Sequence, residues 1–257
     1  MKNILPFIPE RPAKPRNSGI TMVMDKGLSI REAEDFMSVG KEYTDFVKLG
    51  FGTSLVTPGI EKKILIYKNA HSIPYFGGTL FEAFIIRNMF GEFVEYLDKY
   101  EIDLVEVSDG SYDIDHKKKL EYITKLAKRG IVISEVGSKK KEVVYSPDEW
   151  VAMMKAELNA GSVKVIAEAR ESGTTGIYNE DGSINNKIID AISKHVKLEN
   201  VIWEAPMKSQ QAWFIKHFGA NVNLGNIAPG EIIPLESLRC GLRGDTFFQF
   251  LPEELKK

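Results

Sequence analysis

Short β-type runs alternate with helical patterns along most of this chain, and this alternation restricts the fold more than any other feature. Between the runs, apolar residues recur at the 3.6-residue spacing of one helix face, as in 81–100, where we expect a single helix. Strands that alternate with helices form βαβ units and a parallel sheet. The eight predicted strands are 19–25, 45–50, 72–77, 103–108, 131–136, 163–168, 200–204 and 221–225.

The number and length of these units favour a closed barrel. Eight units in 257 residues have about 32 residues each, and a complete (β/α)8 barrel has roughly 250. The alternative is a doubly wound open sheet, whose dinucleotide-binding form carries a Gly-x-Gly-x-x-Gly turn after the first strand. Here Asp25 is followed by Lys-Gly-Leu-Ser. We therefore predict an α/β fold: one (β/α)8 (TIM) barrel over residues 19–257, preceded by an extended arm, residues 1–18.

Composition excludes several other classes of protein. With 43% hydrophobic residues and one cysteine, Cys240, the chain can bury a core but cannot form an internal disulfide. A net charge of −2 gives no general attraction to nucleic acid or an anionic membrane. Apolar runs such as 20–24 are far shorter than the ~20 residues that cross a bilayer, and residues 1–16 lack the apolar region of a secretion signal. We expect a soluble, cytoplasmic protein that has no nucleic-acid or membrane partner.

Charged side chains gather at the carboxyl ends of the predicted strands, where a TIM barrel carries its active site. Because side chains alternate along a strand, Ile131, Ile133 and Glu135 share one face. If the last charge of each strand points inward, four glutamates meet at one mouth. The alternative is that these charges only cap strands at the solvent boundary. The strand-end residues are Asp25, Lys48, Glu106, Asp109, Glu135, Glu168, Arg170, Glu204 and Asn226.

Such a carboxylate cluster needs a compensating cation. Two carboxylates about 4 Å apart repel each other by roughly 4 kcal/mol at an effective dielectric constant of 20. Carboxylate ligands without histidine or cysteine suit Mg²⁺ or Mn²⁺ better than zinc. The histidines fall mostly on predicted helices or their edges, where we interpret them as surface or packing residues: His71, His116, His195 and His217. The sequence therefore predicts a hard-cation site.

Basic residues and glycine-containing loops supply candidate anion contacts. The turn at 225–230 opens into a helix and can direct backbone N–H groups at a phosphate, with Asn226, Arg239 and Arg243 nearby. A glycine-rich loop with surface arginines is the alternative. Lys48 has the inward parity of its strand, and a lysine held near anions can neutralise substrate charge or donate a proton. For Lys139, in a run of three lysines, plain solvation is the alternative.

Eight short motifs follow one another at or near these strand ends. They are VMDKG at 23–27, DFVKLGFGTS at 45–54, GGTLFE at 77–82, VEVSDG at 105–110, SEVG at 134–137, EARESG at 168–173, EAPMKSQQ at 204–211, and the segment 238–246. Together they resemble the phosphosulfolactate synthase (ComA) family, and the resemblance extends from about residue 19 to residue 247.

The resemblance implies a (β/α)8 enzyme, a carbon–sulfur lyase that uses Mg²⁺ to add sulfite to phosphoenolpyruvate and gives (2R)-2-phospho-3-sulfolactate. It implies a homo-oligomer, and a product that leads to coenzyme M or to sulfolactate. Lys139 corresponds to the lysine that protonates the enediolate. With it we assign Lys48 as catalytic, Glu106, Glu135 and Glu168 as metal residues, Asp25, Asp109 and Glu204 as supporting residues, and Arg170, Asn226, Arg239 and Arg243 as substrate or phosphate ligands.

Two other functions remain open at this stage. Some relatives of the family are associated with heat stress in plants, so a non-catalytic barrel protein is one alternative. Another Mg²⁺-dependent enolate lyase, acting on a phosphorylated carboxylate, is the second. An incomplete charged mouth would favour the first alternative, and use of a nucleophile other than sulfite would favour the second.

Overall fold

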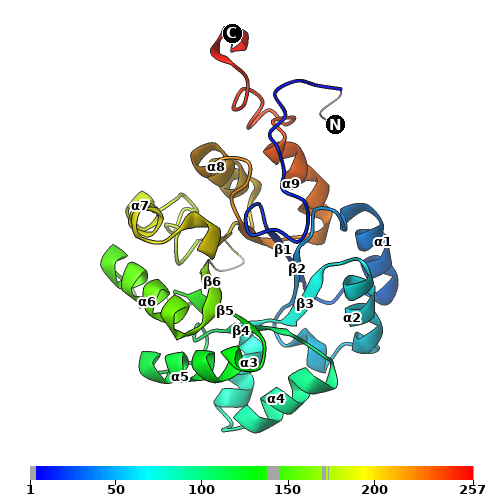
Figure 1. The fold of residues 1–257 in the computed structure, drawn as a ribbon, viewed down its shortest axis with the longest axis vertical. Coiled ribbons are helices and arrows are strands. Elements are labelled where there is room, and N and C mark those ends of the chain that lie inside the picture. The colour runs from blue at the N-terminus through cyan, green and yellow to red at the C-terminus, as the bar shows by residue number, and fades with distance from the viewer. Residues whose placement is uncertain (1–3, 138–144, 170–171, 173, 257) are drawn as a thin grey trace.

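Eight parallel strands form a nearly closed barrel, and helices surround it (Figure 1). The structure is a computed structural model and describes residues 4–137, 145–169, 172 and 174–256. The predicted (β/α)8 barrel is confirmed. The strands are β1 Thr21–Asp25, β2 Phe46–Leu49, β3 Ile73–Phe76, β4 Leu104–Val107, β5 Ile131–Val136, β6 Ser162–Ala167, β7 Val201–Glu204 and β8 Leu224–Ile227.

The hydrogen-bonded strand order is β3-β2-β1-β8-β7-β6-β5-β4. Pairing of β1 with β8 joins the first strand to the last, which brings the two halves of the chain together. Strands β3 and β4 stand at the two ends of this order, and a side chain connects them: the Tyr75 hydroxyl donates to Glu106 Oε2 over 3.0 Å. The carboxyl ends of all eight strands therefore share one rim.

The helices lie outside the strands (Figure 1), and all but α4 follow the carboxyl end of a strand. They are α1 Ile30–Gly40, α2 Ile60–Asn69, α3 Gly78–Ile85, α4 Phe90–Lys99, α5 His116–Ala127, α6 Pro147–Ala160, α7 Asn186–His195, α8 Lys208–Phe218 and α9 Ile232–Arg239. Capping boxes start two of them: the Ser29 hydroxyl accepts from the Glu32 amide, and Ser146 does the same for Glu149. In the described part of the chain, no helix is long and apolar enough to span a membrane.

Two predicted elements differ from the observed ones. The single helix expected over 81–100 is two helices, α3 and α4, because Asn88 between them has φ = 56°, which no α-helix accommodates. Their apolar faces still meet, with Phe81 and Phe93 ring centroids 5.5 Å apart. The last strand begins at Leu224 rather than at 221. The Asn223 side chain bonds backbone groups of Ile20 and Val201 just before that point.

The amino ends of the strands form the opposite rim, which an N-terminal arm covers. Arg11 pairs with Glu236 at 2.9 Å and donates to the carbonyl of Gly19, while Arg16 pairs with Asp45 at 2.9 Å. Lys14 donates to the carbonyl of Lys41. Both chain termini lie beyond α9 (Figure 1). A pocket of about 1190 Å³ opens between the arm and this rim.

Candidate active site

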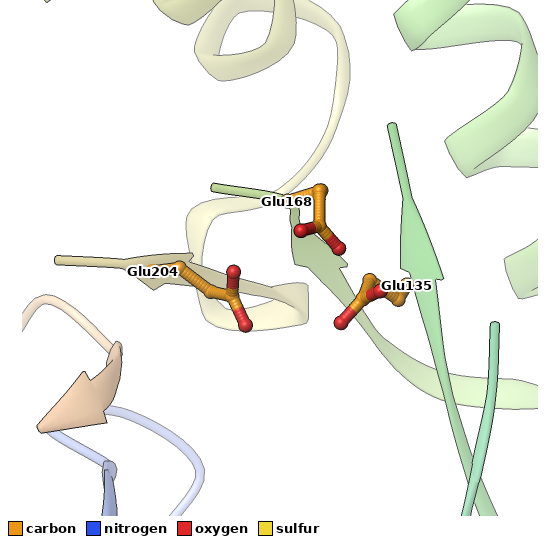
Figure 2. A group of neighbouring side chains, drawn as sticks. All are labelled: Glu135, Glu168 and Glu204. Atoms are coloured by element: carbon orange, nitrogen blue, oxygen red, sulfur yellow. The ribbon is translucent and has the colours of Figure 1, made fainter. Parts of the chain in front are cut away.

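Three buried glutamates meet at the carboxyl rim and form what we call the glutamate triad: Glu135, Glu168 and Glu204. They stand at the ends of β5, β6 and β7, and one carboxylate oxygen from each lies within 4.8 Å of the others. Figure 2 shows the three carboxyl groups turned toward a common space. At most 2% of each residue is exposed. The inward parity predicted for these strands accounts for this convergence.

Lys48 supplies a positive charge beside the triad. Its Nζ lies 2.9 Å from Glu106, 3.3 Å from Glu135 and 3.7 Å from Glu204. Burial by itself lowers the pKa of Lys48, but the neighbouring charges of Glu106 and Glu135 outweigh burial and hold that pKa well above its usual value. The ammonium group therefore stays protonated. Among the described residues, this one ammonium group therefore lies between carboxylates that come from three different strands.

Glu106, which we assigned as a metal residue, lies at the mouth beside the triad. Its Oε1 accepts from the Gly78 amide at 2.6 Å and pairs with Lys48, while its Oε2 accepts from the Tyr75 hydroxyl. Burial, and next the Glu106 charge, hold the pKa of Tyr75 well above its usual value, so the hydroxyl remains a donor. Glu204, which we expected only in support, takes the third place in the triad. The alternation of side chains along the strands placed Glu106 and Glu204 on inward faces. Only the folded barrel shows which carboxylate oxygens lie close together.

Two aspartates expected in support turn away from the mouth. Asp25 faces α2, where its Oδ2 pairs with Lys63 at 2.7 Å and accepts from the Tyr67 hydroxyl at 2.7 Å. Asp109 pairs with the buried Lys119 at 2.8 Å, and burial raises its pKa although Lys119 opposes that shift. Both aspartates therefore connect strand ends to the helices outside them.

Arg239, which we predicted as a phosphate ligand, lies at the opposite end of the barrel from the glutamate triad. It is fully buried at the amino rim, where Nη1 donates to the carbonyls of Ala220 at 2.6 Å and Val222 at 2.7 Å. The reason is geometric: α9 runs back from the carboxyl rim, so its last residue reaches the other end of the barrel. Arg239 is therefore a structural residue.

The remaining anion ligands that we predicted, and the predicted catalytic residue Lys139, divide into residues that the structure describes and residues that it does not. Asn226 lies at the carboxyl rim in β8 with φ = 56°, and its Oδ1 is buried with no hydrogen-bond partner among the described residues. Arg243 follows α9, and its Nη1 is likewise buried without a hydrogen-bond partner in the described part of the chain. Lys139 and Arg170 lie outside the described residues.

Several buried polar residues near the rim were not found from the sequence. Glu82 in α3 accepts from the Ser108 hydroxyl and from the amides of Ser111 at 2.7 Å and Tyr112 at 2.6 Å, which fixes the turn after β4. Lys119 lies in α5 next to other lysines, and this sequence is typical of a solvated helix face. Burial lowers its pKa, but the charges of Glu157 and Asp109 outweigh burial and raise that pKa above the usual value. Only their burial in the folded chain distinguishes these residues.

The fold and the site together define a (β/α)8-barrel enzyme whose active site is built from strand-end carboxylates and a buried lysine. A sequence profile described as (2R)-phospho-3-sulfolactate synthase (ComA) matches residues 9–245. The chain belongs to this family. An enzyme of this family acts on small-molecule substrates.

Curated relatives support the same assignment. A phosphosulfolactate synthase from Methanocaldococcus jannaschii is 42% identical over 89% of this chain and 94% of its own length. One from Bacillus subtilis is 40% identical over 94% of this chain and 97% of its own. The Arabidopsis thaliana protein HEAT-STRESS-ASSOCIATED 32 is 24% identical over 90% of this chain and 88% of its own. The higher identity to the synthases does not favour the stress-protein alternative.

Among solved structures, 3-hexulose-6-phosphate synthase from Salmonella typhimurium superposes with a TM-score of 0.58 at 13% identity. The alignment covers 87% of this chain and 100% of that one. At this identity the similarity concerns the barrel fold alone.

Proposed function

We propose that the protein catalyses the Mg²⁺-dependent addition of sulfite to phosphoenolpyruvate, giving (2R)-2-phospho-3-sulfolactate. The observation that carries the proposal is the buried glutamate triad beside Lys48 in a chain of the phosphosulfolactate synthase family. The names of the relatives from Bacillus subtilis and Methanocaldococcus jannaschii support the same product. We also predict that the protein is cytoplasmic, that it forms a homo-oligomer, and that its product leads to coenzyme M or to sulfolactate.

The donor set of the triad fits a hard divalent cation. Its oxygens come from three buried carboxylates within 4.8 Å of one another, and Mg²⁺ prefers oxygen ligands of this kind. Glu135, Glu168 and Glu204 would hold the ion. When bound, Mg²⁺ would stabilise the negative charge that develops on the substrate carboxylate.

The chain's own residues supply the remaining chemistry. The sulfur lone pair of sulfite forms a bond to the methylene carbon, and the electrons of the carbon–carbon double bond move toward the carboxylate. Lys48 keeps its proton and places a positive charge beside Glu135 and Glu204, where it offsets part of the charge of the substrates. We assign Lys139 as the donor of the proton that the phosphate-bearing carbon then accepts, and Arg170, Asn226 and Arg243 as anion ligands.

A direct assay tests this function. Purified protein with Mg²⁺, phosphoenolpyruvate and sulfite should form phosphosulfolactate, detected by mass spectrometry and ³¹P NMR, and omission of sulfite or removal of metal with EDTA should stop the reaction. No turnover with any of several divalent metals would contradict the proposal. Turnover with other nucleophiles but not with sulfite would favour the alternative enolate lyase.

A further inference from the structure

Each residue of the glutamate triad is also held by its backbone carbonyl, from outside the barrel. The carbonyl oxygen of Glu135 accepts from Lys119 Nζ at 2.6 Å, that of Glu168 from the Ile177 amide at 3.2 Å, and that of Glu204 from the Tyr178 hydroxyl at 2.5 Å. Two of these three donors are side chains. The three hydrogen bonds hold the main chain in place at the residue that carries each carboxylate.

Lys119 joins three elements through one ammonium group. The residue is 1% exposed and extends from α5. Besides the Glu135 carbonyl, its Nζ contacts Asp109 Oδ1 after β4 at 2.8 Å and Glu157 Oε1 on α6 at 2.8 Å. Charge-assisted hydrogen bonds of this kind are short and strong. The contacts with Asp109 and with the Glu135 carbonyl are hydrogen bonds, and the contact with Glu157 is an ion pair. Lys119 therefore acts on the site through the carbonyl of Glu135.

Tyr178 holds the other side of the triad. The segment after β6 folds back over the rim, with a bridge between Tyr178 and Ile184. Gly176 in this segment has φ = 70°, and a Cβ there would lie 1.9 Å from the Glu168 carbonyl oxygen, so only glycine permits the approach. The Ala169 amide donates to Glu204 Oε2 at 2.8 Å. The segment therefore fixes both Glu168 and Glu204.

We propose that Lys119 and Tyr178 are positioning residues of the metal site, acting through the carbonyls of Glu135 and Glu204. Mg²⁺ requires near-ideal octahedral geometry with oxygens at about 2.0–2.1 Å, so ligands on three separate strands need a fixed separation. Lys119 sets the position of the β5 end and Tyr178 that of the β7 end. The inference rests on the metal site of the proposed function.

The test measures metal binding in the absence of substrates. Mn²⁺ is titrated into the full chain and the free ion is followed by electron paramagnetic resonance, for wild type, Lys119→Met and Tyr178→Phe. Loss of a residue that orients a metal ligand typically weakens metal binding 10- to 100-fold. We expect Kd to rise about tenfold in both variants. Tyr178→Phe removes one hydroxyl and retains the ring, so it remains informative if Lys119→Met does not fold.

Two matched controls separate positioning from general stability. Lys63 and Tyr67 on α2 are a buried lysine and a buried tyrosine that both contact Asp25, at the end of β1. Lys63→Met and Tyr67→Phe therefore remove the same groups from the same rim without touching the triad. Their melting temperatures should fall like those of the test variants, while their Mn²⁺ Kd stays at the wild-type value.

The Mn²⁺ dissociation constants of the wild-type chain, the test variants and the controls decide whether Lys119 and Tyr178 position the metal site. The inference is overturned if Tyr178→Phe and every folded Lys119 variant bind Mn²⁺ with the wild-type Kd, or if the controls weaken binding equally. It is also overturned if the wild-type chain binds no Mn²⁺. A wild-type chain that binds Mn²⁺ but converts no phosphoenolpyruvate with sulfite would overturn the proposed reaction and leave the positioning role supported by the variants.

Discussion

The two ends of the barrel both bury charged side chains, but they balance them differently. At the amino end, Arg11 pairs with Glu236, Arg16 pairs with Asp45, and Arg239 is held by backbone carbonyls. At the carboxyl end, in the described part of the chain, Lys48 contacts the carboxylates of Glu106, Glu135 and Glu204. The amino end also holds a pocket of about 1190 Å³. The amino end therefore pairs Arg11 and Arg16 with one carboxylate each, whereas the carboxyl end gathers several carboxylates around one ammonium group, and the proposed chemistry belongs to this second arrangement.

Removing Lys48 should have the largest effect, because three buried carboxylates lose an ammonium group that lies within 3.7 Å of each. Loss of one partner of a buried ion pair costs about 3–5 kcal/mol, and we expect Lys48→Met to lower the free energy of unfolding by about that amount and to abolish turnover. Urea denaturation with and without Mg²⁺ measures the first, and Mg²⁺ should restore part of the loss. An unchanged midpoint of unfolding would show that Lys48 does not balance the cluster.

The pH dependence of this effect follows from the direction of the pKa shift. The pKa of Lys48 is raised in the folded protein, so its contribution is complete below the unfolded-state value of about 10.4 and is lost only as pH rises through the higher folded pKa. The difference in unfolding free energy between wild type and Lys48→Met should therefore not decline between about pH 6 and about pH 9. A decline within that window would contradict the assignment.

Exchanging single carboxylates should separate Glu204 from Glu106. Glu204→Gln should weaken Mn²⁺ binding and lower kcat/KM by about 100-fold, because it removes one of the three proposed metal ligands. Glu106→Gln should leave the Mn²⁺ Kd within about twofold and act on kcat instead, since Glu106 contacts Lys48, Tyr75 and the Gly78 amide. Titration of Mn²⁺ and steady-state kinetics test the two variants. Weaker Mn²⁺ binding in Glu106→Gln but not in Glu204→Gln would favour the assignment of Glu106 as a metal residue.

Arg239 tests the amino end. Arg239→Met removes the donors to the carbonyls of Ala220 and Val222, and buried groups left without a partner cost about 1–3 kcal/mol. We expect a fall of about 3 kcal/mol in the free energy of unfolding, with kcat and KM of the folded enzyme unchanged. A raised KM for phosphoenolpyruvate in a variant of normal stability would favour the original phosphate-binding prediction.

The smallest effect should come from the arm. Arg16→Ala removes the ion pair with Asp45, whose Oδ2 also accepts from the Thr21 amide, so part of the network persists. We expect a loss of about 1 kcal/mol in the free energy of unfolding and unchanged kcat, measured by thermal denaturation and the sulfite assay. A large loss of turnover would show that the two ends of the barrel are coupled.

Local patterns predicted the fold and part of the site. The alternation of β-type runs with helical spacing is a property of residues close together in the sequence, and it predicted the (β/α)8 barrel correctly. Strand parity placed Glu135, Glu168 and Glu204 on inward faces, and the structure brings them together. The continuous helix over 81–100 failed because the apolar spacing continues across Asn88, whose positive φ ends the helix without altering that spacing.

The roles of charged residues depended on distances that no local pattern contains. Glu106 and Glu204 follow the same strand pattern, yet Glu106 accepts from Gly78 and Tyr75 while Glu204 joins the triad. Lys119 and Tyr178 carry no distinguishing spacing, because their partners are backbone carbonyls on other elements. The sequence by itself determined the barrel and the inward parity of its strand-end glutamates, since both follow from local periodicity. Only the tertiary structure decided which charges meet, because closure of the ring sets those distances.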